Sequence, residues 1–286
     1  MSDDFDVAIL GGGVAGLAAA RALSARDLRL VLVEGRDRLG GRILTREIDG
    51  LPLPIELGAE FIHGDAAETF AIADAASLLV DELPDDHLWL RGDRFVRIPD
   101  FWSDMLRVRR RIRGPRDRSF AAFLDAARSI PPRLRRMSRE FVSGYHAADP
   151  ARISALSLAA GDEETEGPGQ NRQYRIVPGY ASVVAALRSA IGEACEIRLS
   201  TIARRIAWRK GHVAIHCQST MGGDPVEVRA RAVVLAVPAA VLKAGPEAPA
   251  GIAFDPPLRR LEDDLAQLEA GHVLKLVFAF RERFWD

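Results

Sequence analysis

Three glycines near the amino terminus carry the clearest chemical signal in this sequence. Gly11, Gly13 and Gly16 follow an apolar stretch, Phe5 to Leu10, and open an alanine- and leucine-rich stretch that we predict to be a helix from Val14 to Ala25. In such a unit the first glycine permits a tight turn, the second lets a pyrophosphate approach the backbone, and the third lets the helix pack closely on the strand. The positive end of the helix dipole would then face the phosphates. The spacing predicts a dinucleotide site.

The residues after this helix narrow the choice of dinucleotide. A second apolar stretch, Leu28 to Val33, ends in Glu34, whose carboxylate can accept hydrogen bonds from both hydroxyls of an adenosine ribose and would repel the 2′-phosphate of NADP. The run from Arg36 to Arg42 then adds a second glycine pair, Gly40 and Gly41. A nicotinamide domain has no evident need for this run, whereas a flavin, with its longer pyrophosphate and ribityl chain, does. The residues therefore favour FAD over NAD.

These motifs resemble the flavin-containing amine oxidase family, which includes monoamine oxidases, polyamine oxidases and related histone demethylases. The stretches that carry the resemblance are GGGVAG at 11–16, Glu34, RLGGR at 38–42 and ELGAEFIHG at 56–64. The resemblance implies an α/β fold with a discontinuous, Rossmann-like FAD-binding domain and an α+β substrate domain. The residues that we expect to bind the cofactor are Gly11, Gly13, Val14, Ala15, Gly16, Glu34, Gly35, Arg36, Gly40, Gly41, Arg42, Gly58, Ala59, Glu60, Ile202 and Val237.

Two further side chains are candidates for catalysis by the same resemblance. Family members carry a lysine on a strand of the substrate domain, followed by a Phe-Trp pair, and Lys275 with Phe284 and Trp285 matches this arrangement. Lys275 would reach toward flavin N5 through a water, and an amine there could hold the water that hydrolyses an imine. His63 matches the position at which polyamine-oxidising members meet their substrate with a histidine or an acid. An imidazole there could orient a cationic amine or help to deprotonate it, while a loop histidine that caps a backbone group is an equally good interpretation. Glu60 could touch substrate or flavin, or lie on a solvated face.

Other groups of residues suggest no further chemistry. His212 and His216 would share one face of a strand, but Cys217 would point to the other, so we expect no metal site. Two cysteines, Cys195 and Cys217, do not make a disulfide framework. The arginines between 107 and 118 are best interpreted as a solvated helix face rather than a nucleic-acid patch.

The composition is that of a globular protein. The 286 residues are 48% hydrophobic and 28% charged, with a net charge of −1. No stretch approaches the length of a membrane span, and the acidic start lacks the features of a signal peptide. We therefore expect a cytoplasmic protein without membrane or nucleic-acid binding. The family resemblance implies that its partners are a small-molecule amine and O2.

The remaining sequence alternates between helical and strand patterns. The predicted helices are 65–77, 100–113, 119–129, 132–144, 181–191 and 258–269, and the predicted strands are 87–90 with 94–98 as a hairpin, 196–199, 202–208, 212–217, 226–229, 233–237 and 273–280. Residues 161–171 look like a polar loop. We expect the FAD-binding domain to comprise residues 1–65 and 174–245, and the substrate domain residues 66–173 and 246–286.

The resemblance covers only the amino-terminal portion of the family's sequence pattern. Family members continue well beyond the Phe-Trp pair, so we expect the substrate domain to be incomplete and the chain to be an amino-terminal part or truncated product of an amine oxidase-like flavoprotein, with a possible missing C-terminal half. The leading hypothesis is FAD-dependent oxidation of an amine, with polyamines as the candidate substrates, by hydride transfer to flavin N5 with release of H2O2. The alternatives are a flavin desaturase or protoporphyrinogen oxidase-like enzyme, which Lys275 disfavours, and a non-catalytic flavoprotein fragment. An NAD-dependent dehydrogenase is more distant.

Overall fold

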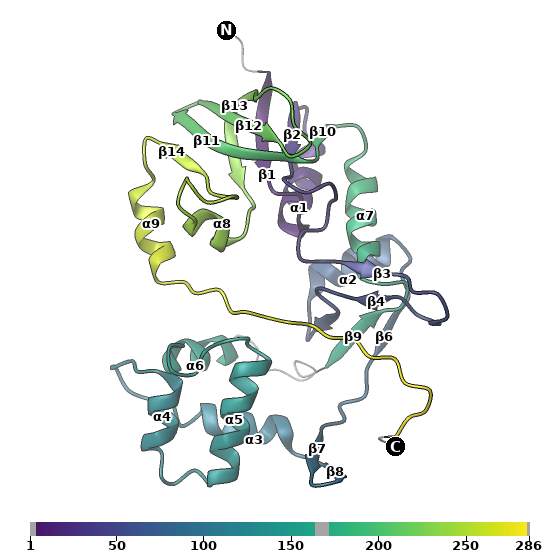
Figure 1. Cartoon of the computed structure of the whole chain (residues 1–286), viewed down its shortest axis with the longest axis vertical. Helices are drawn as coiled ribbons and strands as arrows, with labels where there is room; N and C mark the ends of the chain where they lie inside the picture. The colour runs from purple at the N-terminus through teal and green to yellow at the C-terminus, as the bar shows by residue number, and fades with distance from the viewer. Residues whose placement is uncertain (1–3, 164–171, 285–286) are drawn as a thin grey trace. The chain divides into compact units, whose positions relative to one another are not determined.

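The computed structural model describes residues 4–163 and 172–284. Its largest element is a seven-stranded sheet with the order β10-β2-β1-β13-β12-β11-β14 (Figure 1). Its strands are β1 (Phe5–Leu10), β2 (Leu30–Val33), β10 (Cys195–Arg198), β11 (Thr201–Arg209), β12 (His212–Ser219), β13 (Val226–Leu235) and β14 (Ala253–Asp255).

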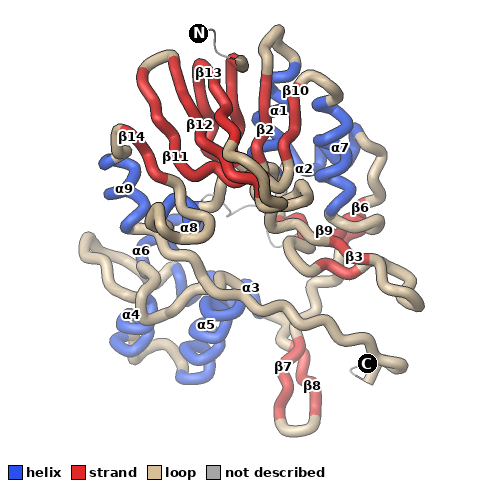
Figure 2. Tube along the Cα trace, turned by 45° about the horizontal axis from the view of Figure 1, so that its top comes forward, coloured by secondary structure: helices blue, strands red, loops and turns tan. Residues whose placement is uncertain are grey.

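One half of this sheet is parallel and contains the glycine-rich turn. β1 pairs in parallel with β2 on one side and with β13 on the other, and β10 extends the parallel order beyond β2. Helix α1 (Val14–Ser24) connects β1 to β2 and packs against α7 (Ala181–Ile191), which begins and ends where the sequence predicted (Figure 2). Every residue of β2 is buried, as expected for an inner parallel strand that is covered on both faces. The predicted strand–helix–strand unit is confirmed.

The strands β13, β12 and β11 form an antiparallel part of the sheet, and this part corrects one prediction. Residues 226–229 and 233–237 were predicted as two strands, but β13 runs unbroken from Val226 to Leu235. Its first half pairs with β12 and its second half with β1, so one strand joins the two halves of the sheet. The stretch from Val233 to Val237 is half-buried rather than fully buried. The pairing with β12 ends at Ala230, so only β1 flanks the last residues of β13.

Smaller elements surround the sheet. They are β3 (Thr45–Arg46), β4 (Ile55–Glu56), α2 (Ala67–Ala75), α8 (Ala239–Lys243) and α9 (Arg259–Ala266). The side chain of Glu56 is only 3% exposed and accepts hydrogen bonds from the Thr45 hydroxyl and the Tyr180 N–H at 2.8 and 2.6 Å. Because Tyr180 precedes α7, this buried carboxylate satisfies an N–H group at the start of that helix.

A second group of elements is mainly helical. It contains the hairpin β7 (Leu88–Arg91) and β8 (Arg94–Arg97), with α3 (Phe101–Arg109), α4 (Phe120–Ala126), α5 (Pro132–Gly144) and α6 (Ala155–Glu163). A three-stranded sheet has the order β5-β9-β6, made of β5 (Phe61–His63), β9 (Gln173–Ile176) and β6 (Val80–Glu82). The hairpin and the first three of these helices confirm the sequence predictions. Helix α6 was not predicted; it takes up the start of the expected loop at 161–171, and residues 164–171 lie outside the described part of the chain.

Contacts divide the chain into two compact units. The first holds residues 1–60, 67–80 and 176–269, and the second holds 61–66, 81–175 and 270–286. The predicted boundaries placed 67–80 and 246–269 with the substrate domain. In the structure α2 packs on α7 and β14 pairs with β11, which ties both stretches to the large sheet. The functional labels of the two units stay predictions.

The last described residues correct another prediction. Residues 273–280 were predicted to form a strand, but residues 269–280 have no regular secondary structure (Figure 1). Their apolar side chains are exposed, for example 83% for Leu274 and 69% for Phe278. A strand is defined by its hydrogen-bonded neighbour, and none of the described strands pairs with this stretch.

Within the described residues, no helix combines the length and apolarity that crossing a bilayer demands.

Candidate cofactor and amine site

The glycine turn after β1 has two positions at which a side chain cannot be accommodated. Gly11 has a φ of +106°, and a Cβ on it would lie 2.8 Å from the carbonyl oxygen of Ala236. A Cβ on Gly16 would lie 1.9 Å from the carbonyl oxygen of Gly11, so only glycine lets α1 approach the turn this closely. These two residues therefore fix the path of the backbone between β1 and α1.

Gly13 differs from the other two glycines because the space beside it is open. The nearest atom to a Cβ on Gly13 would be the Cα of Gly41, at 3.9 Å. Gly13 is the N-cap of α1 and offers no side chain to the first-turn N–H groups of Val14 and Ala15. A helix start without a side-chain cap and with space in front of it suits the pyrophosphate of a dinucleotide. We call this helix start at residues 13–15, with the open space beside it, the cradle. The open space at Gly13 is the feature of the structure that fits FAD.

Glu34 joins the glycine turn to the end of β2. One carboxylate oxygen accepts the N–H of Gly12 at 2.6 Å, and the other accepts the N–H of Arg36 at 2.9 Å. An ionised carboxylate has about four acceptor positions, so capacity for two ribose hydroxyls remains. The carboxylate is thus held at the edge of the open cradle, where the adenosine ribose of FAD would lie.

The run from Arg36 to Ile43 is held by its own arginines. The guanidinium of Arg36 donates to the carbonyl of Gly41 at 2.7 Å, and that of Arg38 donates to Gly41 at 3.0 Å and to Ile43 at 2.9 Å. The Gly40 N–H donates to the Gly12 carbonyl at 2.8 Å, which places this loop beside the glycine turn. We predicted Arg36 as a cofactor ligand; here its guanidinium also braces the loop, a role that it shares with Arg38.

The predicted cofactor residues 58–60 lie beside the end of this loop. The Ala59 N–H donates to the carbonyl of Arg42 at 3.1 Å, and a Cβ on Gly58 would lie 2.0 Å from that oxygen. Glu60 follows directly and ends this part of the first unit. The arrangement brings 58–60 next to the second glycine pair, although 16 positions separate Arg42 from Gly58.

Ile202 and Val237 were predicted as cofactor residues from later parts of the chain, at the start of β11 and just after β13. Ile202 lies beside Gly35, where a Cβ would come within 3.2 Å of its Cγ1, and the N–H of Thr201 donates to the Glu34 carbonyl at 2.9 Å. Val237 lies beside Gly11, whose Cβ would be 3.1 Å from its nitrogen. All the predicted cofactor-binding residues therefore belong to the first unit, and their binding of the cofactor stays a prediction.

His63 belongs to the second unit, on β5. Its Nδ1 lies 3.2 Å from the hydroxyl of Tyr145, and the two rings meet edge to face. Partial burial lowers the pKa of His63 below its ordinary value, so the imidazole is neutral at neutral pH. A neutral imidazole retains one nitrogen lone pair with which to bind an ammonium group.

Lys275 lies in the stretch without regular structure and also belongs to the second unit. Its predicted position on a buried strand is therefore wrong for this structure, because the strand itself is absent from the described residues. The neighbouring side chains Leu274 and Leu276 are exposed by 83% and 65%. The role of Lys275 at flavin N5 stays a prediction.

A group of residues beside His63 was missed by the sequence reasoning. Tyr145 and His146 follow the end of α5, and the guanidinium of Arg109 on α3 donates to Nε2 of His146 at 2.7 Å. Burial and the nearby Arg109 charge lower the pKa of His146 to about 4. The only sequence signal was the Gly-Tyr-His triplet that ends a predicted helix.

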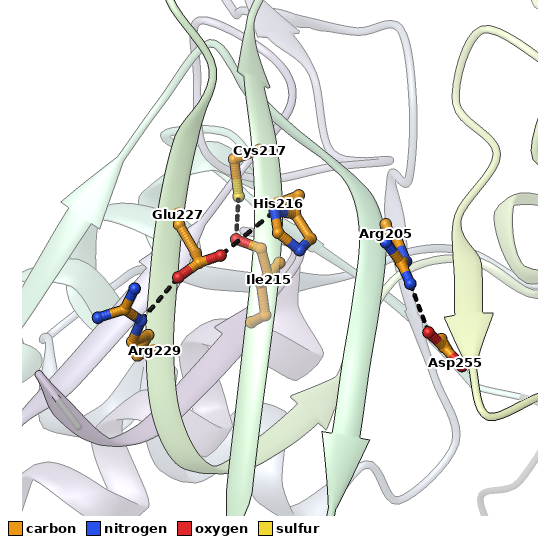
Figure 3. Close-up of polar contacts among 7 residues, drawn as sticks. All are labelled: Arg205, Ile215, His216, Cys217, Glu227, Arg229 and Asp255. Atoms are coloured by element: carbon orange, nitrogen blue, oxygen red, sulfur yellow. Dashed lines mark hydrogen bonds and ion pairs between the residues drawn. The ribbon is translucent and has the colours of Figure 1, made fainter. Parts of the chain in front are cut away.

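The histidines and cysteine of β12 form no metal site. His216 lies 3.4 Å from the carboxylate of Glu227, which also accepts a 2.6 Å hydrogen bond from Arg229 (Figure 3). The Cys217 thiol is buried and contacts the carbonyl of Ile215 at 3.8 Å. The described residues contain no group of three or more histidine, cysteine or acidic side chains that could hold a metal ion. Burial raises the pKa of the Cys195 and Cys217 thiols to about 11, so neither is a nucleophile at neutral pH.

Comparison with known proteins agrees with this geometry. Residues 14–286 match the family described as flavin containing amine oxidoreductase. Putrescine oxidase of Kocuria rosea is 28% identical over 98% of this chain and 65% of its own length, and polyamine oxidase 3 of Oryza sativa subsp. japonica is 28% identical over 97% and 60%. The chain thus spans less than two thirds of the length of these relatives.

A solved structure shows the same fold. The structure of cyclohexylamine oxidase from Brevibacterium oxydans IH-35A superposes with a TM-score of 0.71 over 92% of this chain and 63% of that protein, at 23% identity. The family match covers nearly the whole chain, and the prediction of a flavin cofactor is confirmed by it. The family match agrees with the cradle at Gly13 and with the loop at residues 36–43. This chain belongs to the flavin-containing amine oxidoreductase family.

Proposed function

We propose that the protein oxidises a primary or secondary amine, with a polyamine such as putrescine as the substrate class. Support comes from the relatives, which carry the names putrescine oxidase and polyamine oxidase, and from the open cradle at Gly13. FAD, when bound there, would accept a hydride from the α-carbon of the amine at N5 and pass the electrons to O2, giving H2O2. The cradle is the single observation that carries the proposal, because a Cβ at Gly13 would fill it.

The residues of the chain supply binding and orientation in this proposal. Glu34 would hold the ribose, and the N–H groups at the start of α1 would hold the pyrophosphate. His63 would bind the substrate ammonium and take up the proton that must leave before the amine nitrogen can donate electrons. Lys275 would hold the water that hydrolyses the imine product. A cytoplasmic location belongs to the same proposal.

The first experiment is an absorbance spectrum of the purified chain after incubation with FAD and removal of unbound cofactor. Protein-bound flavin bands are expected. The loaded protein is then mixed with putrescine, spermidine or cyclohexylamine without oxygen, and bleaching of the bands followed by H2O2 release on aeration is expected for at least one amine. Retention of flavin with no bleaching by any amine would contradict amine oxidation and leave cofactor binding in place. A failure to retain flavin would contradict the cradle.

A further inference from the structure

Tyr145 is the residue that contacts the imidazole of His63. Its hydroxyl oxygen lies 3.2 Å from His63 Nδ1, and the ring centroids are 5.6 Å apart at an interplanar angle of 79°. The two residues are 82 positions apart, so the contact exists only because the second unit folds β5 against the end of α5. The polar contact is to Nδ1, which leaves Nε2 as the nitrogen that can serve a ligand.

The ring of Tyr145 is held in place from several sides. It stacks on Phe141 at 4.8 Å and 16°, and it meets the edge of Trp102 at 5.9 Å. The Tyr145 N–H donates to the Phe141 carbonyl at 2.8 Å, because Tyr145 caps α5. Aromatic contacts of this kind contribute about 0.5–1.5 kcal/mol each. The hydroxyl is therefore presented by a ring whose position is fixed by α3 and α5.

A positive charge lies close to this hydroxyl. The Arg109 guanidinium donates to Nε2 of His146 and lies 5.7 Å from the centre of the Phe141 ring. Because Arg109 stays protonated, His146 must accept this hydrogen bond, and it does so in its neutral form. Burial raises the pKa of Tyr145, which keeps its proton at neutral pH, while the Arg109 charge stabilises negative charge on the phenol oxygen. The hydroxyl therefore stays protonated, and its oxygen keeps lone pairs with which it can accept a hydrogen bond.

We propose that Tyr145 is a positioning residue for His63: its hydroxyl oxygen accepts the Nδ1–H, so that the lone pair of the neutral imidazole resides on Nε2. The inference rests on the proposed function, in which His63 meets the substrate amine. Nε2 then takes a proton from the substrate ammonium: an N–H bond of the ammonium breaks, an Nε2–H bond forms, and the amine nitrogen regains its lone pair. The proton passes to water in a later step.

The other groups around His63 do not replace this contact. Phe61 meets the imidazole edge to face at 6.1 Å and has no polar atom in its side chain. Gln173 lies opposite His63 in the register between β5 and β9. The charged groups nearest in the sequence are Asp65 and Glu60, two and three residues away. Arg172, whose carbonyl accepts the Gly64 N–H at 2.9 Å, pairs its guanidinium with Glu82. Among the described residues, Tyr145 therefore supplies the side-chain hydrogen bond to the imidazole of His63.

Nuclear magnetic resonance of the imidazole nitrogens in the full chain tests the proposal directly. The ¹⁵N shifts of His63 at pH 8 report which nitrogen carries the proton, and His63→Gln identifies its signals among those of the six histidines. We expect the proton on Nδ1 in the natural chain. In Tyr145→Phe, which keeps the stacked ring and removes the hydroxyl, we expect the proton to move to Nε2 and the pKa of His63 to change by about 0.5 unit or more. The matched control is Tyr174→Phe, which removes another tyrosine hydroxyl of the second unit.

The outcomes separate this proposal from the proposed function. The same tautomer and pKa of His63 in Tyr145→Phe and in the natural chain would overturn the role of Tyr145, whatever the enzyme does. If the FAD-loaded protein oxidises an amine, Tyr145→Phe should lower kcat/KM about 10-fold. In the profile of kcat/KM against pH, the pKa that limits activity on the acidic side should also shift in this variant. Tyr174→Phe should show neither change. A tautomer that responds as expected in a protein that oxidises no amine would refute the amine oxidation and leave the orientation of His63 by Tyr145 established.

Discussion

The carboxylate of Glu34 accepts the N–H of Gly12 at 2.6 Å, which ties the end of β2 to the glycine turn after β1. The same carboxylate accepts the Arg36 N–H at 2.9 Å, so it also positions the start of the loop at residues 36–43. One side chain therefore shapes both backbone segments that border the cradle. This dual contact makes Glu34 a structural partner of the glycines as well as a proposed ligand of the ribose.

Replacement of this acid should weaken FAD binding. In Glu34→Gln one oxygen still accepts a hydrogen bond, but the amide nitrogen cannot, so one backbone N–H or one ribose hydroxyl loses its partner. We expect the Kd for FAD to rise about 10-fold or more, corresponding to the roughly 1.5–3 kcal/mol of a charge-assisted hydrogen bond. Quenching of FAD fluorescence on titration measures the Kd. Glu193→Gln, at an exposed position in the first unit, is the control and should bind FAD as the natural chain does. Equal affinities in both variants would argue against the ribose contact.

Alanine substitutions at two glycines of the turn should distinguish an effect on cofactor binding from an effect on stability. Gly13→Ala adds a Cβ with no atom closer than 3.9 Å, so the free energy of unfolding should fall by less than about 1 kcal/mol, the usual cost of alanine at an N-cap. The same methyl fills the space in front of the helix start, so FAD binding should be lost. Gly16→Ala places its Cβ 1.9 Å from a carbonyl oxygen and should lower the free energy of unfolding by about 3 kcal/mol or more. Urea denaturation and FAD titration of both variants give the comparison, and normal FAD affinity in Gly13→Ala would refute the cradle.

The lysine prediction can be tested against a matched lysine. Lys275→Met keeps the aliphatic length of the side chain and removes its charge, so FAD affinity should be unchanged. If Lys275 handles the water near flavin N5, kcat for amine oxidation should fall about 100-fold. Lys210→Met, in the turn between β11 and β12, is the control and should retain full kcat. Stopped-flow reduction and reoxidation of the flavin identify the affected step, and equal rates in the two variants would remove Lys275 from the catalytic residues.

The stability of the protein should fall in mild acid through His146. The pKa of this residue is lowered from 6.5 to about 4 in the folded chain, so between these values the unfolded state binds more protons than the folded state. Stability from this group is therefore complete above pH 6.5 and is lost as the pH falls toward 4, by on the order of 2 kcal/mol once solvent screening of this partly exposed group reduces the effect. His146→Gln retains an acceptor for Arg109 and cannot be protonated, so it should lose less stability between pH 7.5 and pH 4.5.

Urea denaturation at the two pH values measures this difference. The exposed His272 provides the control, because His272→Gln should keep the pH dependence of the natural chain. An identical loss of stability in His146→Gln and in the natural chain would show that other groups cause the acid sensitivity.

Local spacing was enough to predict much of the first unit. The positions of Gly11, Gly13 and Gly16 follow from backbone constraints that act within a few residues, and the periodicity of α1, α5 and α7 is equally local. The family resemblance then added the residues 58–60, Ile202 and Val237, which the structure places beside Arg42, Gly35 and Gly11 respectively. These elements could be predicted because each carries its signal in neighbouring residues.

Tertiary structure decided the rest, because the deciding contacts join residues that are distant in the sequence. The pairing of β13 with β12 and then with β1 made one strand of two predicted ones, and the packing of α2 on α7 moved residues 67–80 into the first unit. The hydrogen bond between His63 and Tyr145 spans 82 positions and leaves no local pattern. An apolar alternation at 273–280 gives strand propensity, but a strand also needs a hydrogen-bonded neighbour, and that requirement is met only by the fold.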